Sequence, residues 1–153
     1  MFSLFSKKAI SYFSAPEQEK IVQAIKDAEL HTSGEVRVYI ESRCNYIDPL
    51  RRAKEIFGNL KMHQTAAHNA ALVYVAMKDR QLAIFGDEGI HQKVGSEFWN
   101  DEVQKMLSHF NKQDYASGIA GVVTAIGQAL EIHFPYDGLT DKNELPDEIV
   151  FGK

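Results

Sequence analysis

Two adjacent carboxylates held between glycines form the segment of this sequence best suited to chemistry. The segment reads Gly86, Asp87, Glu88, Gly89, between an apolar run and the expected start of a helix. Hard cations such as Ca2+ and Mg2+ prefer carboxylate oxygens as ligands, and glycines let a loop approach an ion closely. The alternative is structural, because Asp87 is also a good helix cap and Glu88 suits the positive end of a helix dipole. Asp87 and Glu88 are therefore candidate metal ligands, with helix capping as the competing interpretation.

Other catalytic signatures are missing from the sequence. It contains no G-x-G-x-x-G, no Walker loop, no G-x-S-x-G and no H-E-x-x-H. The single cysteine, Cys44, excludes an internal disulfide and a multi-cysteine zinc site. The six histidines show no ligand spacing beyond His63 and His68, five residues apart, which suits a loop zinc site only weakly. Catalytic residues therefore stay unknown at this stage.

Composition predicts one globular domain of ordinary size. The chain has 153 residues, 44% of them hydrophobic and 25% charged, which excludes wholesale disorder. Its net charge of −4, without a basic stripe, argues against nucleic acid as a partner. The longest unbroken apolar run, residues 70–77, is far shorter than the roughly 20 residues that a transmembrane helix needs. With no secretory signal peptide at the N-terminus, the expected location is cytoplasmic.

The elements that must position the two carboxylates follow from hydrophobic periodicity. Ser14 and Glu17 form a capping box, which predicts a first helix. Apolar and polar residues then alternate over Glu35–Glu41, which predicts a strand, and Asp48 before a proline predicts the start of a second helix. Residues 70–77 are apolar on both faces, as in a central strand.

A hairpin and two helices complete the domain. The turn after Met77 predicts that residues 81–85 pair antiparallel to residues 70–77, with Lys78 facing Gln81. Helices are expected over residues 89–110, with a break near Gly95, and over residues 114–133.

The predicted fold class is an α/β/α sandwich whose small mixed sheet has a parallel pair plus one antiparallel hairpin strand. This topology places Glu35 and Asn69 at the same end of the sheet as Asp87 and Glu88. The four residues together form the predicted divalent-cation site.

The C-terminal residues differ from the rest of the chain. Residues 1–136 are expected to form the domain, and residues 137–153 an acidic tail with five acids against two lysines. Ile149 and Phe151 are among its large apolar residues, which a purely solvated arm does not need. Their presence predicts that the end folds back onto the domain or onto a partner protein.

Three stretches, taken together, resemble the TPM domain family over about residues 14–133. They are residues 32–38 (TSGEVRV), residues 69–76 (NAALVYVA) followed by Asp79 and Arg80, and residues 84–91 (IFGDEGIH). The resemblance implies an α/β/α fold, divalent-cation binding, acid-phosphatase-like activity and accessory roles in the assembly or repair of membrane complexes. Many members are secreted or membrane-anchored, whereas this chain looks like a short cytoplasmic, bacterial-type member.

Three functions are consistent with these observations. The first is a domain that binds Ca2+ or Mg2+ and serves as an accessory or interaction module. The second is a weak metal-assisted phosphatase, in which the metal polarises a phosphoryl oxygen and activates water. The third is a structural module that binds a partner through its C-terminal tail. Binding ranks above catalysis, because the sequence offers acids but no convincing nucleophile, general base or phosphate-binding arginine pair.

Overall fold

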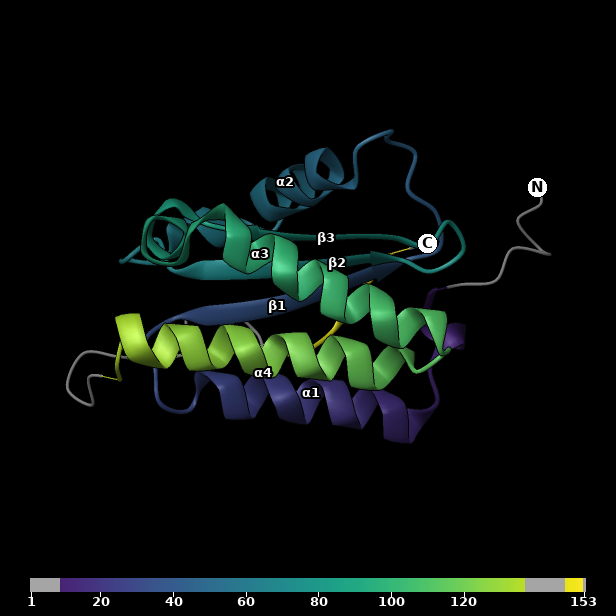
Figure 1. Ribbon diagram of the computed structural model, residues 1–153, viewed down its shortest axis with the longest axis horizontal. Helices are drawn as coiled ribbons and strands as arrows, with labels where there is room; N and C mark the ends of the chain where they lie inside the picture. Colours follow the sequence, from purple (N-terminus) through teal and green to yellow (C-terminus); the bar gives the residue numbers. More distant parts are fainter. Residues whose placement is uncertain (1–8, 137–147, 153) are drawn as a thin grey trace.

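The computed structural model describes residues 9–136 and 148–152, which form a mixed sheet with helices on both faces (Figure 1). The elements are, in chain order, the 3-10 helix η2 (Ala9–Tyr12), α1 (Ala15–Glu29), β1 (Glu35–Glu41), α2 (Pro49–Asn59), the 3-10 helix η3 (Met62–Gln64), β2 (Ala70–Ala76), β3 (Gln81–Gly86), α3 (Glu88–Asn111), α4 (Tyr115–His133) and β4 (Val150–Phe151). The fold is an open α/β sandwich, as the sequence predicts.

The sheet has the strand order β3-β2-β1-β4. β1 and β2 are parallel, and β2 and β3 form the antiparallel hairpin. Both relations confirm the predicted topology. Because β1 and β2 are parallel, their first residues, Glu35 and Ala70, lie at one end of the sheet, next to the last residue of β3.

The hairpin register differs from the prediction by two residues. Gln81 pairs with Ala76, and Leu72 pairs with Phe85 rather than with Asp87. The prediction assumed a tight turn of two residues, whereas the turn takes up all of residues 77–80. Arg80 in this turn has a left-handed φ of 53°, a conformation that residues other than glycine, asparagine and aspartate seldom adopt.

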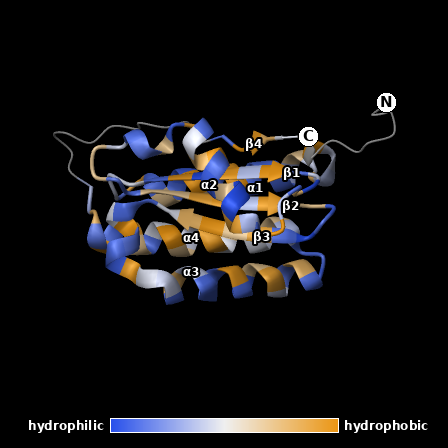
Figure 2. Ribbon diagram, turned by 90° about the horizontal axis from the view of Figure 1, so that it is seen from above, coloured by the Kyte–Doolittle hydropathy of each residue, from blue (hydrophilic) through white to orange (hydrophobic). Residues whose placement is uncertain are grey.

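The two faces of the sheet are covered unequally. α1, α3 and α4 pack on the face formed by Val36, Val38 and Ile40, whereas α2 packs on the face that carries Leu72 and Tyr74 (Figure 1). In Figure 2 the central strands are mostly hydrophobic, while the helices combine hydrophobic and hydrophilic sides. This difference is expected for strands covered on both faces and for helices with one solvent-facing side.

Two features of the helical layer bear on the predictions. α3 is kinked at Gly95, whose φ of 78° lies in the left-handed region, so the predicted break is present. α4 is long and apolar enough, by length and composition alone, to span a membrane, which the eight-residue apolar run did not reveal. Over half of that window, 56%, is buried inside the protein, as expected of the core helix of a domain.

The last described residues of the tail belong to the sheet. Val150 and Phe151 form β4, which pairs in parallel with Tyr39 and Ile40 of β1. Phe151 also contacts Phe13, with the ring centres 6.5 Å apart. The end of the chain thus folds back onto the domain, and the fourth strand was absent from the sequence-based prediction. Residues 137–147, which hold most of the predicted acidic tail, lie outside the described residues.

Candidate functional site

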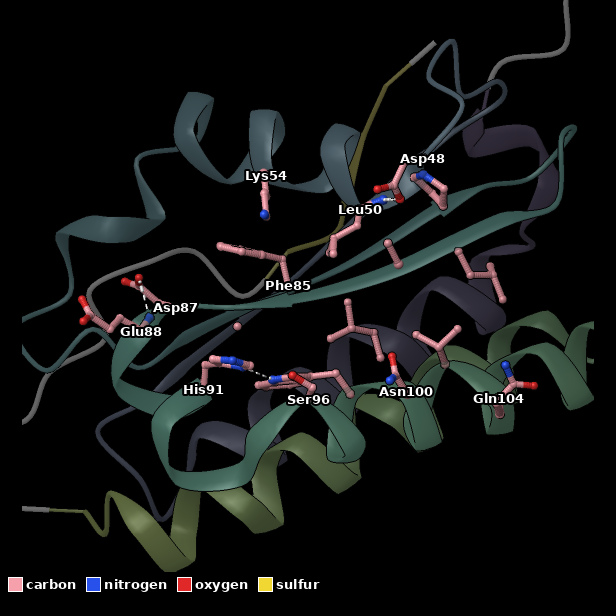
Figure 3. Close-up of a pocket in the computed structure, with 17 residues that line it drawn as sticks. Asp48, Leu50, Lys54, Phe85, Asp87, Glu88, His91, Ser96, Asn100 and Gln104 are labelled. Atoms are coloured by element: carbon pink, nitrogen blue, oxygen red, sulfur yellow. Dashed lines mark hydrogen bonds between the residues drawn. The ribbon is translucent and has the colours of Figure 1, made fainter.

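A groove of about 780 Å³ runs along β3 between α2 and α3 (Figure 3). β3 is an edge strand, so the groove opens along a side of the sheet that no other described strand covers. Asp87 and Glu88 lie at one end of the groove and Asp48 at the other, with Lys54 of α2 between them (Figure 3). The carboxylates predicted from sequence therefore lie on the rim of this groove.

Trp99 forms part of the groove wall and is positioned by a glycine. A Cβ atom added to Gly86 would lie 2.2 Å from the Trp99 ring, so only glycine allows this close packing. The indole Nε1 donates a hydrogen bond to Nδ1 of His91 at 3.0 Å. His91 accepts this bond with an unprotonated ring nitrogen, which fixes the orientation of both rings on the groove wall.

Asp87 is the N-cap of α3. Its Oδ1 accepts a hydrogen bond from the backbone N–H of Glu88 at 2.8 Å, and its Oδ2 lies 3.3 Å from Nδ1 of His68. Glu88 is exposed and accepts a hydrogen bond from the side-chain amide of Gln92 at 3.2 Å. The structural interpretation of Asp87 as a helix cap is thus correct. Both carboxylates lie at the end of the groove, and that of Glu88 is directed outward (Figure 3).

Gly89 has a packing role of its own. A Cβ atom there would lie 2.2 Å from the carbonyl oxygen of Ala67 and 2.6 Å from that of His68. The loop before β2 therefore lies directly against the first turn of α3. The glycines that flank the two acids serve this close packing of chain segments, a role that the sequence pattern did not distinguish from wrapping around an ion.

Glu35 and Asn69 lie at the predicted end of the sheet but inside the protein. Their exposed fractions are 2% and 1%. The Asn69 side chain donates to Oγ of Ser33 at 3.1 Å, while its buried Oδ1 has no hydrogen-bond partner among the described residues. The predicted ligand set is thus divided between the groove rim and the interior. Within residues 9–136 and 148–152, no three His, Cys, Asp or Glu side chains are grouped so as to hold a metal ion.

The opposite end of the sheet holds an ionic network centred on the buried carboxylate of Glu41. Arg52 of α2 donates two hydrogen bonds of 2.9 Å to the carboxylate of Glu41, one from Nε and one from Nη2. The hydroxyl of Tyr74 donates to the same carboxylate, and Arg52 also pairs with Glu55, which accepts from Tyr46. The carboxylates of Glu41 and Glu55 are therefore both satisfied by partners within the protein.

The network shifts the acid–base behaviour of its members. Burial, followed by the hydrogen bond to Glu41, raises the pKa of the Tyr74 hydroxyl well above its usual value. The hydrogen bond to Glu41 also raises the pKa of Arg52. Sequence analysis predicted the strand that ends at Glu41 but did not single out Arg52 or Tyr74. Their side chains meet only after α2 has packed on the sheet, and no local motif marks that contact.

Asp79, a turn residue in the sequence analysis, also has a structural role. Its carboxylate accepts the backbone N–H of Cys44 at 2.8 Å and lies 3.3 Å from Nη1 of Arg43. It therefore ties the β2–β3 turn to the segment after β1. Cys44 is partly buried and makes a weak contact, 3.5 Å, with the carbonyl oxygen of Tyr46.

The fold and this edge groove define an open α/β-sandwich domain, and comparison with known proteins identifies its family. The model of the TPM domain matches residues 8–129, so the chain belongs to the TPM domain family. The recognition made from the three sequence stretches is thereby confirmed.

Solved structures agree with this assignment. The NMR structure of the BA42 protein from the psychrophilic bacterium Bizionia argentinensis is 35% identical, with a TM-score of 0.82 over 97% of this chain and 99% of that one. The N-terminal domain of the cg2496 protein from Corynebacterium glutamicum has a TM-score of 0.63 at 15% identity, covering 82% of each chain, which shows the fold alone. No curated protein matches the sequence.

Proposed function

We propose that this TPM domain is an accessory binding module that takes up a divalent cation, Ca2+ or Mg2+, at Asp87 and Glu88. One observation carries the proposal. Among the described residues, no lysine or arginine forms an ion pair with either carboxylate, and only His68 lies within ion-pair distance of Asp87. Adjacent carboxylates without a basic partner repel each other, and a cation relieves that repulsion.

The charged residues elsewhere support the choice of this pair. Two of the acids at the other end of the sheet, Glu41 and Asp79, are paired with Arg52 and Arg43, and Asp48 there caps α2. A cation there would have to displace an arginine, whereas at Asp87 and Glu88 it competes with a histidine contact and with neutral hydrogen bonds from the Glu88 N–H and the Gln92 amide. Glu35 and Asn69 are proposed as ligands of lower rank, since both are buried and a cation would have to enter the interior to reach them.

Binding is expected to be weak. Two carboxylates provide few of the 6–8 oxygens that Ca2+ prefers, although Mg2+ is commonly held by one or two carboxylates and several waters. The N-terminus of α3 also opposes a cation, because its dipole is positive at that end. Together these effects predict a dissociation constant of about 0.1–1 mM, the range of open, low-charge sites.

A calcium and magnesium titration followed by NMR amide shifts tests the proposal. The shifts of the wild type are expected to concentrate on residues 86–89, and an Asp87→Asn, Glu88→Gln double variant is expected to bind about tenfold more weakly or not at all. The matched control is Glu97→Gln with Asp101→Asn, which removes the same charge from exposed positions of α3. Equal loss of binding in the control, or none in the test variant, would show that Asp87 and Glu88 are not the site.

The phosphatase and tail hypotheses rank lower. A phosphatase needs a phosphate-binding group, and Arg43 and Arg52, the arginines near the carboxyl end of β1, already pair with carboxylates. In the described part of the tail, Val150 and Phe151 are used within the sheet. A partner that binds through these residues would first have to release β4.

A further inference from the structure

The edge of β3 that faces the groove carries unused backbone hydrogen-bonding groups. Asp87 N donates to Ala70 O at 2.9 Å, so these two residues form a hydrogen-bonded pair just beyond the end of the hairpin. Bonded and non-bonded pairs alternate along antiparallel strands. Leu82, Ile84 and Gly86 therefore direct their N–H and C=O groups away from β2. Among the described residues, none of these groups has a hydrogen-bond partner.

Two walls confine this edge. α2 contributes Leu50 and Lys54 on one side of the strand, and α3 contributes Asn100 on the other (Figure 3). Trp99 and Val103 of α3 also line the groove. The gap between the two helices therefore leaves the backbone of β3 as the floor of a groove. A floor of alternating donors and acceptors between two partly apolar walls is complementary to an extended polypeptide.

The charge of the groove indicates what kind of polypeptide fits. Asp48 lies at one end and Asp87 with Glu88 at the other, against Lys54 as the one lysine among the described lining residues. The Lys54 ammonium lies 5.8 Å from the centre of the Phe85 ring. The ends of the groove are thus acidic, while its middle combines apolar side chains such as Phe85 and Trp99 with Lys54 and Asn100. A positive charge at each end of a ligand would pair with these acidic ends and fix the position of the ligand along the strand.

We propose that this groove binds an extended peptide segment of another protein, which adds to the sheet as a strand alongside β3. The segment is apolar in its middle and carries a basic residue at each end, to meet Asp48 on one side and Asp87 with Glu88 on the other. β3 has six residues, so the two basic residues should stand about 20 Å apart, six residues along an extended chain at roughly 3.4 Å each.

A short synthetic peptide is the probe. It is acetylated and amidated, alternates threonine and valine over five residues, and ends in a lysine on each side. The chain has one tryptophan, Trp99, and it lines the groove, so its fluorescence reports binding directly. The expected dissociation constant is about 1 mM or lower. The amides of Leu82 and Ile84 should become protected from hydrogen exchange. EDTA in the buffer makes the result independent of any cation.

N-methylation of the peptide separates strand addition from simple side-chain contact. Two versions are methylated on alternate backbone amides, one on the odd and one on the even positions. Only one of the two sets faces β3 in an added strand. Strand addition therefore predicts that one version loses binding while the other retains most of it. The proposal is wrong if both methylated versions bind as well as the parent peptide. It is also wrong if the parent peptide shows no binding at a concentration several-fold above about 1 mM.

Protein variants test the walls and the charges. Asn100→Phe places a bulky ring in the groove and should weaken peptide binding at least about tenfold. Ser108→Phe, at an exposed position on the same helix outside the groove, is the matched control and should leave binding unchanged. A peptide with glutamate in place of both lysines should bind more weakly by a similar factor, and equal binding would refute the role of the acidic ends.

A second copy of this chain is the alternative occupant of the groove. Sedimentation of the free protein, together with hydrogen exchange at Ile84, distinguishes the two cases. A monomer with a fast-exchanging Ile84 amide supports a peptide partner. A dimer whose dissociation on dilution exposes that amide would assign the groove to a second copy and overturn the proposal.

Discussion

The two ends of the sheet differ in how they treat negative charge. At the carboxyl end of β1 and β2, Glu41 is held by Arg52 and Tyr74 in a largely buried network. At the opposite end, Asp87 and Glu88 lie on a groove rim, and no described lysine or arginine forms an ion pair with them. The first arrangement stabilises the fold, and the second leaves charge available for a ligand. Neutralising charges should therefore lower stability at the first end and remove binding, with little change in stability, at the second.

The largest effect is expected for Arg52→Met. The substitution leaves the Glu41 carboxylate in the interior with only the Tyr74 hydroxyl as a described side-chain partner. Breaking such a pair from one side costs about 3 kcal/mol, because the remaining charge stays buried without compensation. Urea unfolding measures this loss. Arg51→Met, at the neighbouring exposed position, should change stability by less than about 0.5 kcal/mol. Equal stabilities for the two variants would show that the network does not hold the fold.

Tyr74→Phe is expected to have a smaller effect that depends on pH. At neutral pH the loss of the hydroxyl should cost about 1–2 kcal/mol, since Glu41 keeps its bonds to Arg52. The folded-state pKa of Tyr74 is raised, by burial first and by Glu41 second. The folded protein therefore keeps a proton that the unfolded chain releases above its ordinary tyrosine pKa of about 10.

The stabilisation that Tyr74 provides is lost at alkaline pH. Stability from Tyr74 is complete below about pH 10 and is lost as pH rises above it, by about 1 kcal/mol at about pH 11. Tyr74→Phe lacks this titrating group, so its stability should fall less steeply over the same range. Parallel unfolding curves at neutral and alkaline pH measure the difference. If both proteins lose stability at the same rate, Tyr74 does not titrate as the network requires.

The sequence predicted one end of the sheet better than the other, for physical reasons. Strands β1 to β3 and the helix starts depend on local patterns such as the alternation over Glu35–Glu41 and the capping box at Ser14. The structure confirms the elements that these two patterns predict. Asp87 and Glu88 were singled out because they are adjacent in the chain, and their role as ligands stays a prediction. By contrast, Arg52 and Tyr74 meet through packing of α2 on the sheet, which a local pattern does not encode.

The hairpin register and strand β4 were also not predicted correctly, because no local sequence pattern marks them. The hairpin register depends on the number of turn residues, and the four-residue turn with a left-handed Arg80 has no glycine or asparagine to announce it. β4 contains only Val150 and Phe151, which is too short for any alternation to be detected. The groove itself arises from the positions of α2 and α3 on either side of an edge strand, so it became visible only in three dimensions.

The smallest expected effect on stability belongs to the groove rim. Asp87→Asn with Glu88→Gln removes two negative charges, yet the unfolding free energy should change by less than about 0.5 kcal/mol. Asparagine caps a helix as well as aspartate does, so the bond to the Glu88 N–H is preserved. Loss of the favourable charge–dipole term costs a few tenths of a kcal/mol, and relief of repulsion between adjacent carboxylates offsets it.

Thermal unfolding of this double variant, without and with millimolar Ca2+, completes the comparison. Without the ion its midpoint should match that of the wild type, whereas Arg52→Met should unfold at a clearly lower temperature. With the ion the wild type and Arg52→Met, which both keep the two carboxylates, should gain stability and the double variant should not, because a ligand stabilises the state that binds it. A double variant that is as unstable as Arg52→Met would mean that Asp87 and Glu88 hold the fold together, and the functional contrast between the two ends of the sheet would be lost.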